Sequence, residues 1–311
     1  KNKKKNQSHK NQINQRKDLE KIRTVRGTHD IFGDDQLDFD RINSICESHC
    51  KAFNYQKIST PIMEHAEVFS RTLGGSTDIV SKEMYSFEDI SGDKITLRPE
   101  GTAPITRAII SNSLTEKINQ KFYYFGPMFR RERPQAGRLR QFHQFGVEYI
   151  NNDSVFADVE NIIVAEKILK TLEIRDEVHL QINTLGSANC RKKFRSDLKS
   201  YFSNYKDDLS VDSKIRLEKN VMRILDSKDK RDKELTQGAP KLLNYLSEKS
   251  AGIYENIKTK LQELNIKFTE NINLVRGLDY YNHTAFEYVA NKTSGQNTIL
   301  AGGRYDGLSE L

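Results

Sequence analysis

Apolar residues recur at helical spacing in three stretches of the chain. Residues 37–55 show this spacing over five turns, which predicts one helix with a single apolar face. That face comprises Ile42, Ile45, Cys46, His49 and Phe53. Residues 101–113 and 155–172 also predict helices, and Pro104 is compatible with the first of these because it lies near the helix start.

Strand-like runs lie between these helices. Residues 83–87 and 94–98 are separated by the turn sequence Ser91-Gly92-Asp93, which predicts a hairpin. Residues 121–150 predict a longer hairpin, in which two aromatic-rich runs flank an arginine-rich loop. Near Pro61, the stretch KISTPIME predicts extended backbone.

The pattern changes twice in the second half of the chain. Residues 187–264 are charged and favour helix, so we interpret them as a helical insertion, and the β-prone pattern returns in residues 265–311. Because strands cluster without βα alternation, the fold class is predicted to be α+β with an antiparallel sheet flanked by helices. The chain has neither a G-x-G-x-x-G sequence nor a Walker lysine loop, so any nucleotide would be held by sheet-borne arginines.

Charge is distributed unevenly along the 311 residues. The net charge is +7, but residues 1–21 alone carry +6, which leaves +1 for residues 22–311. The tail KNKKKNQSHKNQINQRK is predicted to be disordered, and any nucleic-acid surface on the body must be a local patch. The sequence has no apolar run that could span a membrane and no secretory signal, and its three cysteines suit a reducing compartment.

The arginine-rich loop is the most informative part of the sequence. A planar guanidinium matches phosphate oxygens bidentately and keeps its charge, so a rigid hairpin bearing several of them is suited to holding a phosphate chain. The loop contains Arg130, Arg131, Arg133, Arg138 and Arg140.

The second strand of this hairpin has an unusual polar face. Side chains alternate along a strand, so Phe142, Gln144, Gly146 and Glu148 share one face, and His143, Phe145, Val147 and Tyr149 share the other. Gln144 and Glu148 lie ~13 Å apart along the strand and could converge on the two ends of an amino acid. The alternative is the solvent face of an edge strand, which the flanking aromatics disfavour.

Three shorter stretches add candidate chemistry. In Glu100-Gly101-Thr102, a carboxylate at a helix mouth could accept from an ammonium group, or could be an ordinary acidic residue at a helix start. In residues 276–281, RGLDYY, two tyrosines at a strand start are expected to point to opposite faces. Residues 301–307, AGGRYDG, taken alone, indicate only a turn.

Together and in this order, these pieces resemble histidyl-tRNA synthetases of the bacterial type, which are class II enzymes. The matching strings are TLGGSTDIVSKEMYSF, LRPEGTAPITRA, FGPMFRRERPQAGRLRQFHQFGVE, LVRGLDYYNHTAFE and AGGRYDGL. The resemblance implies a six- or seven-stranded antiparallel catalytic sheet, divided here into residues 22–186 and 265–311 around the insertion. It also implies a homodimer built partly on the helix before Pro61.

The resemblance also implies residue roles. It assigns the α-phosphate of ATP to Arg130 and Arg276, and the outer phosphates to Arg138, with Glu132 in the ATP site. It assigns the histidine α-amino group to the Glu100–Gly101–Thr102 stretch. Gln144 would contact the carboxylate end, Glu148 and Tyr281 would bind the imidazole, and Tyr280 would line the pocket. The catalytic residues would be Arg130, Gln144 and Arg276.

The implied reaction activates L-histidine with ATP and passes histidine to its tRNA. The histidine carboxylate attacks the α-phosphorus in line, so catalysis consists of positioning and charge stabilisation. Mg²⁺ is expected with ATP, held mainly by phosphates and water. The sequence stops after AGGRYDGL, so we expect the third class II motif and the anticodon-binding domain to be absent, and aminoacylation by these 311 residues to be severely weakened.

Two other functions fit parts of the sequence. A histidine-sensing paralogue that regulates histidine biosynthesis would share the fold without charging tRNA, although it need not keep Arg138 or Arg276. An RNA-binding module would use the tail and the arginine loop, but the near-neutral body disfavours it. The compartment is expected to be the cytoplasm, with an organelle as the alternative.

Three histidines and two cysteines invite other interpretations. Cys46, His49 and Cys50 form a C-x-x-H-C cluster, but zinc needs four ligands, so core packing is the favoured interpretation. His143 is expected to be structural because it faces away from Gln144 and Glu148. His283 follows the tyrosine pair and is left without a role.

Overall fold

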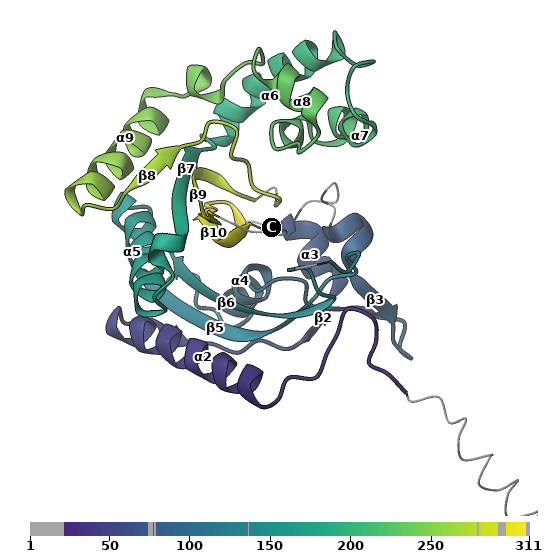
Figure 1. The fold of residues 1–311 in the computed structure, drawn as a ribbon, viewed down its shortest axis with the longest axis vertical. Coiled ribbons are helices and arrows are strands. Elements are labelled where there is room, and N and C mark those ends of the chain that lie inside the picture. The colour runs from purple at the N-terminus through teal and green to yellow at the C-terminus, as the bar shows by residue number, and fades with distance from the viewer. Residues whose placement is uncertain are drawn as a thin grey trace, which may run out of the picture.

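The structure is a computed structural model, and it describes residues 22–73, 77, 79–135, 137–278, 280–291 and 297–308. The basic tail of residues 1–21 lies outside the described residues. Figure 1 shows the layers of the fold, with a long hairpin below, a second sheet at the side, and a helical insertion above.

The hairpin predicted at residues 121–150 is present and forms the floor of the molecule. β5 (Gln120–Phe129) and β6 (Gln141–Ile150) are antiparallel along ten residues each, and β1 (Gln56–Lys57) pairs parallel with β5. The register places Gly126 opposite Gln144, and Tyr124 opposite Gly146. Alternation along β6 therefore presents Gln144, Gly146 and Glu148 on one face, as predicted.

A second sheet has the strand order β10-β9-β7-β8. β9 (Asn282–Ala290) is antiparallel to both β7 (Val178–Thr184) and β10 (Thr298–Arg304), while β8 (Phe268–Glu270) runs parallel to β7. A third, small sheet joins β2 (Met63–His65), β4 (Lys94–Leu97) and β3 (Tyr85–Glu88) in the order β2-β4-β3. The hairpin expected around residues 91–93 is β3–β4.

The single six- or seven-stranded sheet that the resemblance implied is not what the described residues form. Their strands divide among three sheets of three, four and three strands. Within the described ranges, β6 and β10 do not pair with each other, and residues of both strands line one cavity. The polar side chains of β6 and the end of β10 therefore meet across a cavity and not through a shared ladder of hydrogen bonds.

Helices cover the hairpin on both sides. α2 (Asp34–Ala52) lies beneath β5 and β6 in Figure 1, and α4 (Thr102–Ser111) lies on the opposite side of the hairpin. α5 (Val155–Thr171) packs beside α2, and α3 (Ala66–Leu73) and a short π-helix (Ile79–Glu83) flank α4. The predicted helices at 37–55, 101–113 and 155–172 are thus present, with shorter or shifted ends.

The apolar face predicted for α2 is partly wrong. Cys46 and Cys50 are buried against Tyr55 and Tyr123, but Ile42 is 41% exposed. Ile42 lies four residues before Cys46, on the same side of the helix, so helical spacing does not explain its exposure. Tertiary packing, rather than the number of apolar residues, decides which face is covered.

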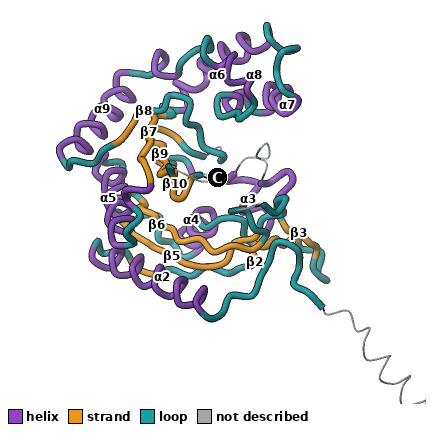
Figure 2. Tube along the Cα trace, in the orientation of Figure 1, coloured by secondary structure: helices purple, strands orange, loops and turns teal. Residues whose placement is uncertain are grey.

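Residues 188–263 contain four α-helices and two 3₁₀ turns, shown in purple at the top of Figure 2. They are α6 (Ala188–Ser203), α7 (Val211–Lys219), Val221–Ile224, α8 (Lys230–Thr236), Leu242–Tyr245 and α9 (Glu248–Glu263). A further 3₁₀ turn, Arg175–Glu177, precedes β7. Leu274, Val275 and Ala285 pack into the core formed by α6, α7 and the 3₁₀ turns, so this core continues into the sheet that contains β9.

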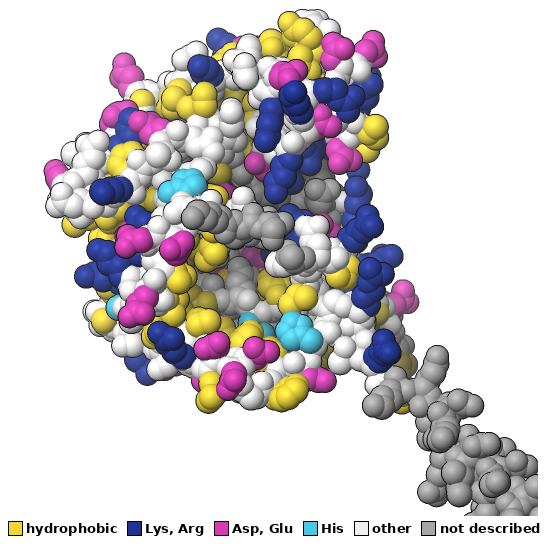
Figure 3. Space-filling view, in the orientation of Figure 1, with side chains coloured by type: hydrophobic (Ala, Val, Ile, Leu, Met, Phe, Trp, Pro, Cys, Tyr) yellow, Lys and Arg dark blue, Asp and Glu magenta, His cyan; other side chains and the backbone are white. Residues whose placement is uncertain are grey.

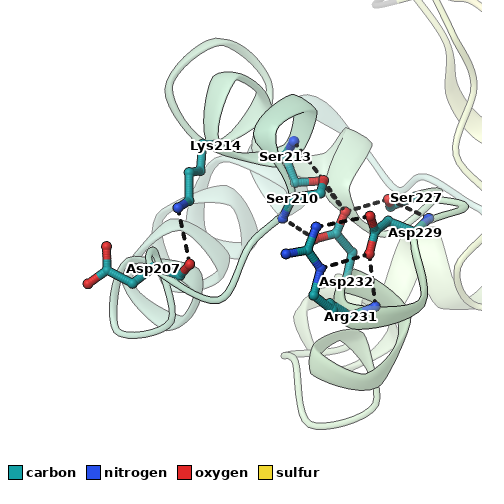
Figure 4. Close-up of polar contacts among 8 residues, drawn as sticks. All are labelled: Asp207, Ser210, Ser213, Lys214, Ser227, Asp229, Arg231 and Asp232. Atoms are coloured by element: carbon teal, nitrogen blue, oxygen red, sulfur yellow. Dashed lines mark hydrogen bonds and ion pairs between the residues drawn. The ribbon is translucent and has the colours of Figure 1, made fainter.

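One buried carboxylate joins α7, α8 and the loop between them (Figure 4). Asp232, 0% exposed, accepts hydrogen bonds from the Ser210 backbone N–H at 2.9 Å and from the hydroxyls of Ser210, Ser213 and Ser227 at 2.5–2.7 Å. Ser210 also caps α7 through the Ser213 N–H. The packing of these short helices therefore depends on a polar centre as well as on apolar contacts. None of the described helices combines the length and apolar character needed to cross a membrane.

Candidate active site

The arginine loop is held in place from both ends. The Arg130 N–H donates to the Arg140 carbonyl at 3.0 Å, and the Arg140 N–H donates to the Gly27 carbonyl at 2.8 Å. The Arg130 side chain donates from Nε to the Pro99 carbonyl at 2.9 Å, and its guanidinium lies 5.1 Å from the ring centre of Phe142. These contacts fix the guanidinium fork at the edge of the polar face of β6.

Glu132 links two of the loop arginines. Its Oε2 accepts from Arg138 Nη1 at 2.9 Å, and its Oε1 lies 4.0 Å from Arg130 Nη1. The Arg138 side chain is 41% exposed, so an incoming anion can reach it. The carboxylate thus spaces two cations that would otherwise repel each other.

The Glu100 side chain binds the first backbone N–H groups of α4, whose N-cap residue is Gly101. Its two carboxylate oxygens accept from the backbone N–H groups of Thr102 and Ala103 at 2.9 and 2.8 Å. Burial raises the pKa of Glu100, although these hydrogen bonds and the Arg130 charge oppose the rise. The helix-start interpretation is therefore correct, and it leaves each oxygen a further lone pair for a ligand ammonium.

Glu148 is the central carboxylate of the polar face. It is 6% exposed, and its oxygens accept from Thr102 Oγ1 at 2.7 Å and from the Tyr305 hydroxyl. Burial raises the pKa of Glu148 to about 7, which outweighs the lowering by the two hydroxyls; nearby Glu100 raises it further. Each oxygen of this carboxylate thus has one hydroxyl donor, and the side chain lines a cavity.

Two glycines near Glu148 accommodate the Tyr124 ring, and Gln144 lies beside them on the same face. A Cβ on Gly146 would lie 2.3 Å from Tyr124, and a Cβ on Gly101 would lie 2.2 Å from the same ring, so both positions require glycine. Next along the strand, the side-chain oxygen of Gln144 is buried and has no hydrogen-bond partner among the described residues. A buried acceptor in this state is a site where a ligand N–H would be favourable.

Arg276 approaches the site from the second sheet. Its Nη1 donates to Glu287 Oε1 on β9, and Glu287 Oε2 accepts from Thr298 Oγ1 at 3.0 Å. The Arg276 guanidinium lies 5.4 Å from the ring centre of Tyr281, and its buried Nε has no partner among the described residues. One donor of this fork is thus held by protein, and another is left for a ligand.

The expectation that Tyr280 and Tyr281 point to opposite faces is wrong. Both rings line the same cavity, with ring centres 4.6 Å apart. The reason is that β9 begins at Asn282, so the two tyrosines lie before the strand and do not alternate. Asp279, between them and Leu278, lies outside the described residues.

Residues 301–307, AGGRYDG, were expected to form only a turn, and this expectation is wrong. Residues up to Arg304 belong to β10, and a Cβ on Gly303 would lie 2.4 Å from the Thr284 carbonyl and 2.9 Å from the Tyr281 ring. Tyr305 follows the strand and reaches Glu148. Sequence reasoning missed Tyr305 as a site residue, although it lies within a string that had been singled out.

A single cavity of about 590 Å³ brings these groups together. Gly101, Glu132 and Arg138 do not line it: Gly101 lies under the Tyr124 ring, and the other two are paired in the hairpin loop. Polar members of its lining come from the loop after β5, from β6, from the start of α4, from the segment before β9 and from the end of β10. They include Glu100, Thr102, Arg130, Gln144, Glu148, Arg276, Tyr280, Tyr281 and Tyr305.

The remaining histidines and cysteines lie elsewhere. The His143 ring packs 4.9 Å from Phe39 and 5.5 Å from Phe125, on the α2 side of the hairpin, as expected for a structural residue. His49 bonds to Thr171 at 2.8 Å, while Cys46 and Cys50 lie in the core. His283 has a φ of 46° at the start of β9, and its pKa is lowered by burial.

A comparison with protein-family models matches residues 27–311 to the family described as histidyl-tRNA synthetase. The chain belongs to this family. A histidine–tRNA ligase from Gluconobacter oxydans is 48% identical over 289 residues, covering 93% of this chain and 70% of the relative. The ligase from Hydrogenovibrio crunogenus is also 48% identical, over 93% of this chain and 68% of its own length.

Solved structures agree with the family. The apo histidyl-tRNA synthetase of S. aureus superimposes with a TM-score of 0.73 at 36% identity, covering 93% of this chain and 67% of that one. The resemblance and the α+β class II fold predicted from sequence are therefore confirmed. A Bacillus halodurans protein described as an ATP phosphoribosyltransferase regulatory subunit/histidyl-tRNA synthetase shares the fold, with a TM-score of 0.68 at 21% identity.

Proposed function

We propose that this family member joins L-histidine to its tRNA by first forming histidyl-adenylate from histidine and ATP. The observation that carries the proposal is the pairing of two arginines, Arg130 and Arg276, with a floor of buried carboxylates in one cavity. Cations suit the phosphates of ATP, and the carboxylates suit the ammonium and imidazole N–H groups of histidine. The identity of 48% to proteins named histidine–tRNA ligase supports the same reaction.

Histidine recognition is assigned to the floor. Glu100 and Thr102 would hold the α-ammonium group of histidine, and Gln144 would contact its carboxylate end. A neutral imidazole donates with one nitrogen and accepts with the other, so Glu148 and Tyr281 could satisfy both. Leaving such groups unpaired would reject an apolar analogue by roughly 10⁴-fold or more.

Activation is assigned to the arginines. An oxygen of the histidine carboxylate attacks the α-phosphorus, the bond to the bridging oxygen breaks, and pyrophosphate leaves. Arg130 and Arg276 would stabilise charge on the α-phosphate oxygens from opposite sides, and Arg138, spaced by Glu132, would hold the outer phosphates. Their fixed positions, set by Pro99 and Glu287, limit reorganisation during the step.

Mg²⁺ is proposed to accompany ATP, held by phosphate oxygens and water. Within the described part of the chain, no three His, Cys, Asp or Glu side chains gather as a protein-built metal site would require. The donors that line the cavity are mainly arginines and singly placed carboxylates, which fits a metal carried mostly by the substrate.

The tRNA partner is supported by charge. Residues 187–264 hold 18 Lys and Arg against 12 Asp and Glu, although the body as a whole is near neutral. Figure 3 shows Lys and Arg side chains along the right-hand edge of this face, from the insertion helices downward. This local excess could contact phosphates close to the cavity.

The oligomeric state and the cellular compartment complete the proposal. A homodimer is supported by apolar side chains left exposed on and near α2 and β2, namely Leu37, Ile42, Ile62 and Met63. The cytoplasm, or an organelle matrix, is proposed as the compartment because Cys46, Cys50 and Cys190 are free thiols.

The test is histidine-dependent ATP–pyrophosphate exchange. Arg276→Ala is expected to lower the exchange rate by roughly 10²–10³-fold, because it removes a preorganised donor to the α-phosphate. The matched control is Arg107→Ala, whose side chain pairs with Glu64 outside the cavity lining, and it should retain exchange. Exchange that survives Arg276→Ala unchanged would contradict the proposed mechanism.

The sensor function gives a different outcome. A histidine-sensing paralogue would bind histidine in calorimetry but would show no exchange in the unmodified chain. If the unmodified chain neither bound histidine nor catalysed ATP–pyrophosphate exchange, both proposed functions would be contradicted.

A further inference from the structure

The last residue of β10 makes a buried ion pair with α5. Arg304 donates from Nη2 and Nε to both carboxylate oxygens of Asp158, with contacts of 2.5–3.3 Å, and from Nη2 to the Ser154 carbonyl at 2.8 Å. The two side chains are only 8% and 7% exposed. A weaker contact joins Arg304 Nη1 to Asp306 at 3.5 Å.

Asp158 is itself on a well-defined support. It lies in the first turn of α5, where the helix dipole favours a carboxylate, and Ser154 caps the same helix through the Phe156 N–H. Arg304 therefore binds both the cap residue and the first turn. The planar guanidinium fork suits this arrangement, because it can address a carboxylate and a carbonyl at fixed angles.

The strand changes register just before this pair. Gly303 lies opposite Ala285, but Arg304 lies opposite Asn282, so two residues of β9 are passed over in one step. Irregularities of this kind turn a strand and re-aim the following side chains. The next residue is Tyr305, whose hydroxyl donates to Glu148.

We propose that Arg304 and Asp158 are positioning residues for histidine recognition: by fixing the end of β10 to α5, they hold Tyr305 against Glu148 and so set the affinity for the imidazole. The inference rests on the proposed function and deepens it. Neither residue is assigned a contact with substrate. Both side chains also line the cavity, so the inference is specifically that their effect on histidine passes through Tyr305 and not through a contact of their own.

A purely structural role makes a different prediction. If the pair only joins α5 to the second sheet, weakening it should lower the unfolding midpoint and reduce binding of histidine and ATP alike. If it positions Tyr305, weakening it should raise the histidine Kd and KM selectively. The arginines that face the phosphates lie on other segments and should keep the ATP KM and kcat near their original values.

The first variant is Arg304→Lys, which keeps the charge beside Asp158 but loses the planar fork. We expect the histidine Kd, measured by calorimetry on the 311-residue chain, to rise about tenfold. In pyrophosphate exchange, the histidine KM should rise similarly, with the ATP KM and kcat within about threefold of their original values. Asp158→Asn should give the same pattern.

The matched control is Arg175→Lys. Arg175 makes a comparable buried ion pair with Glu166, on the same helix α5 but away from the cavity lining, at 2.6 Å. Thermal unfolding followed by circular dichroism should show losses of similar size in Arg304→Lys and Arg175→Lys. Only the former should change the histidine Kd.

The decisive measurement is the double variant Arg304→Lys/Tyr305→Phe. If Arg304 acts through the Tyr305 hydroxyl, the lysine substitution should change the histidine Kd less than twofold once that hydroxyl is gone. A further tenfold loss in the double variant, or an unchanged Kd in Arg304→Lys alone, would overturn the inference. An unmodified chain that binds no histidine would instead overturn the proposed function, and this inference with it.

Discussion

Two buried carboxylates show how the cavity differs from the insertion. Glu148 in the cavity accepts from two hydroxyls, those of Thr102 and Tyr305. Asp232 in the insertion accepts from three hydroxyls and one backbone N–H (Figure 4). Burial raises the pKa of both, but the four donors to Asp232 outweigh burial and its pKa is lowered, whereas that of Glu148 is raised to about 7.

The difference separates a structural carboxylate from one prepared for a ligand. Asp232 has its negative charge fully solvated by protein, so it stabilises the fold and has nothing left to bind. Glu148 is destabilised as an anion until another donor arrives, and an imidazole N–H would be such a donor. At pH 8, a substitution at Glu148 should therefore weaken mainly histidine binding, whereas one at Asp232 should weaken mainly stability.

The largest expected effect is on histidine binding by Glu148→Gln. Losing the charged acceptor for the imidazole should weaken histidine binding roughly 10³-fold, about 4 kcal/mol, as measured by calorimetry at pH 8. The unfolding free energy should fall little or even rise, because a buried charge has been removed.

The control for this change is Glu166→Gln. Glu166 is also buried and also accepts from a tyrosine hydroxyl, that of Tyr288 at 3.0 Å, but it does not line the cavity. It should lose stability and keep histidine affinity. Equal affinity losses in the two variants would show that Glu148 has no special role.

Asp232→Asn should have the opposite effect to Glu148→Gln, with a loss of stability and no loss of histidine affinity. An amide cannot accept all four donors, so some buried donors lose their partner, and the unfolding free energy should fall by about 3 kcal/mol in urea titration at pH 8. Histidine affinity should be unchanged at temperatures where the variant is folded. A large affinity loss without a stability loss would break the comparison.

Local sequence carried much of the fold. The β5–β6 and β3–β4 hairpins and α2, α4 and α5 follow from periodicity and turn residues within each segment. β7 was missed although Val178, Leu180 and Ile182 alternate, because its partners β8 and β9 lie about 90–110 residues later in the chain. The exposure of Ile42 and the division into separate sheets depend on tertiary packing, which local pattern does not encode.

The site residues that lie close together in the sequence could also be predicted from it. Strand alternation placed Gln144 and Glu148 on one face, and Arg130 follows from the arginine-rich loop of the same hairpin. Arg276 was singled out in RGLDYY, and the family resemblance assigned its role. Tyr305 was missed because its partner is 157 residues away. The only available signal was its place in the GGRYDGL string.

The two carboxylates should also give opposite pH dependences of stability. Because the folded-state pKa of Glu148 is raised from 4.5 to about 7, the folded chain binds the extra proton between these values, so this group makes stability fall as pH rises through that window. The difference in unfolding free energy between Glu148→Gln and the unmodified chain should therefore rise by roughly 3 kcal/mol from pH 4.5 to 8.

Asp232 should behave in the reverse way. Its pKa is lowered in the folded state, so its stabilisation is present above its unfolded pKa and is lost as pH falls through the folded value. The deficit of Asp232→Asn should thus shrink in acid. Urea titrations of Glu148→Gln between pH 4 and 8, and of Asp232→Asn from pH 4 downward, measure the two slopes, and slopes of the same sign would contradict the pKa directions.

The smallest expected effect comes from deleting one hydroxyl at each carboxylate. Ser213→Ala leaves Asp232 with three donors, so stability should fall by about 1 kcal/mol and histidine binding should not change.

Thr102→Val removes one of only two hydroxyls from Glu148, which should raise the pKa of that carboxyl further. The Glu148-dependent part of the stability profile should then extend to higher pH, and histidine affinity at pH 7 should fall because more of Glu148 is protonated. If Thr102→Val changed only the unfolding midpoint, as Ser213→Ala should, the two carboxylates would be equivalent and the distinction between them would fail.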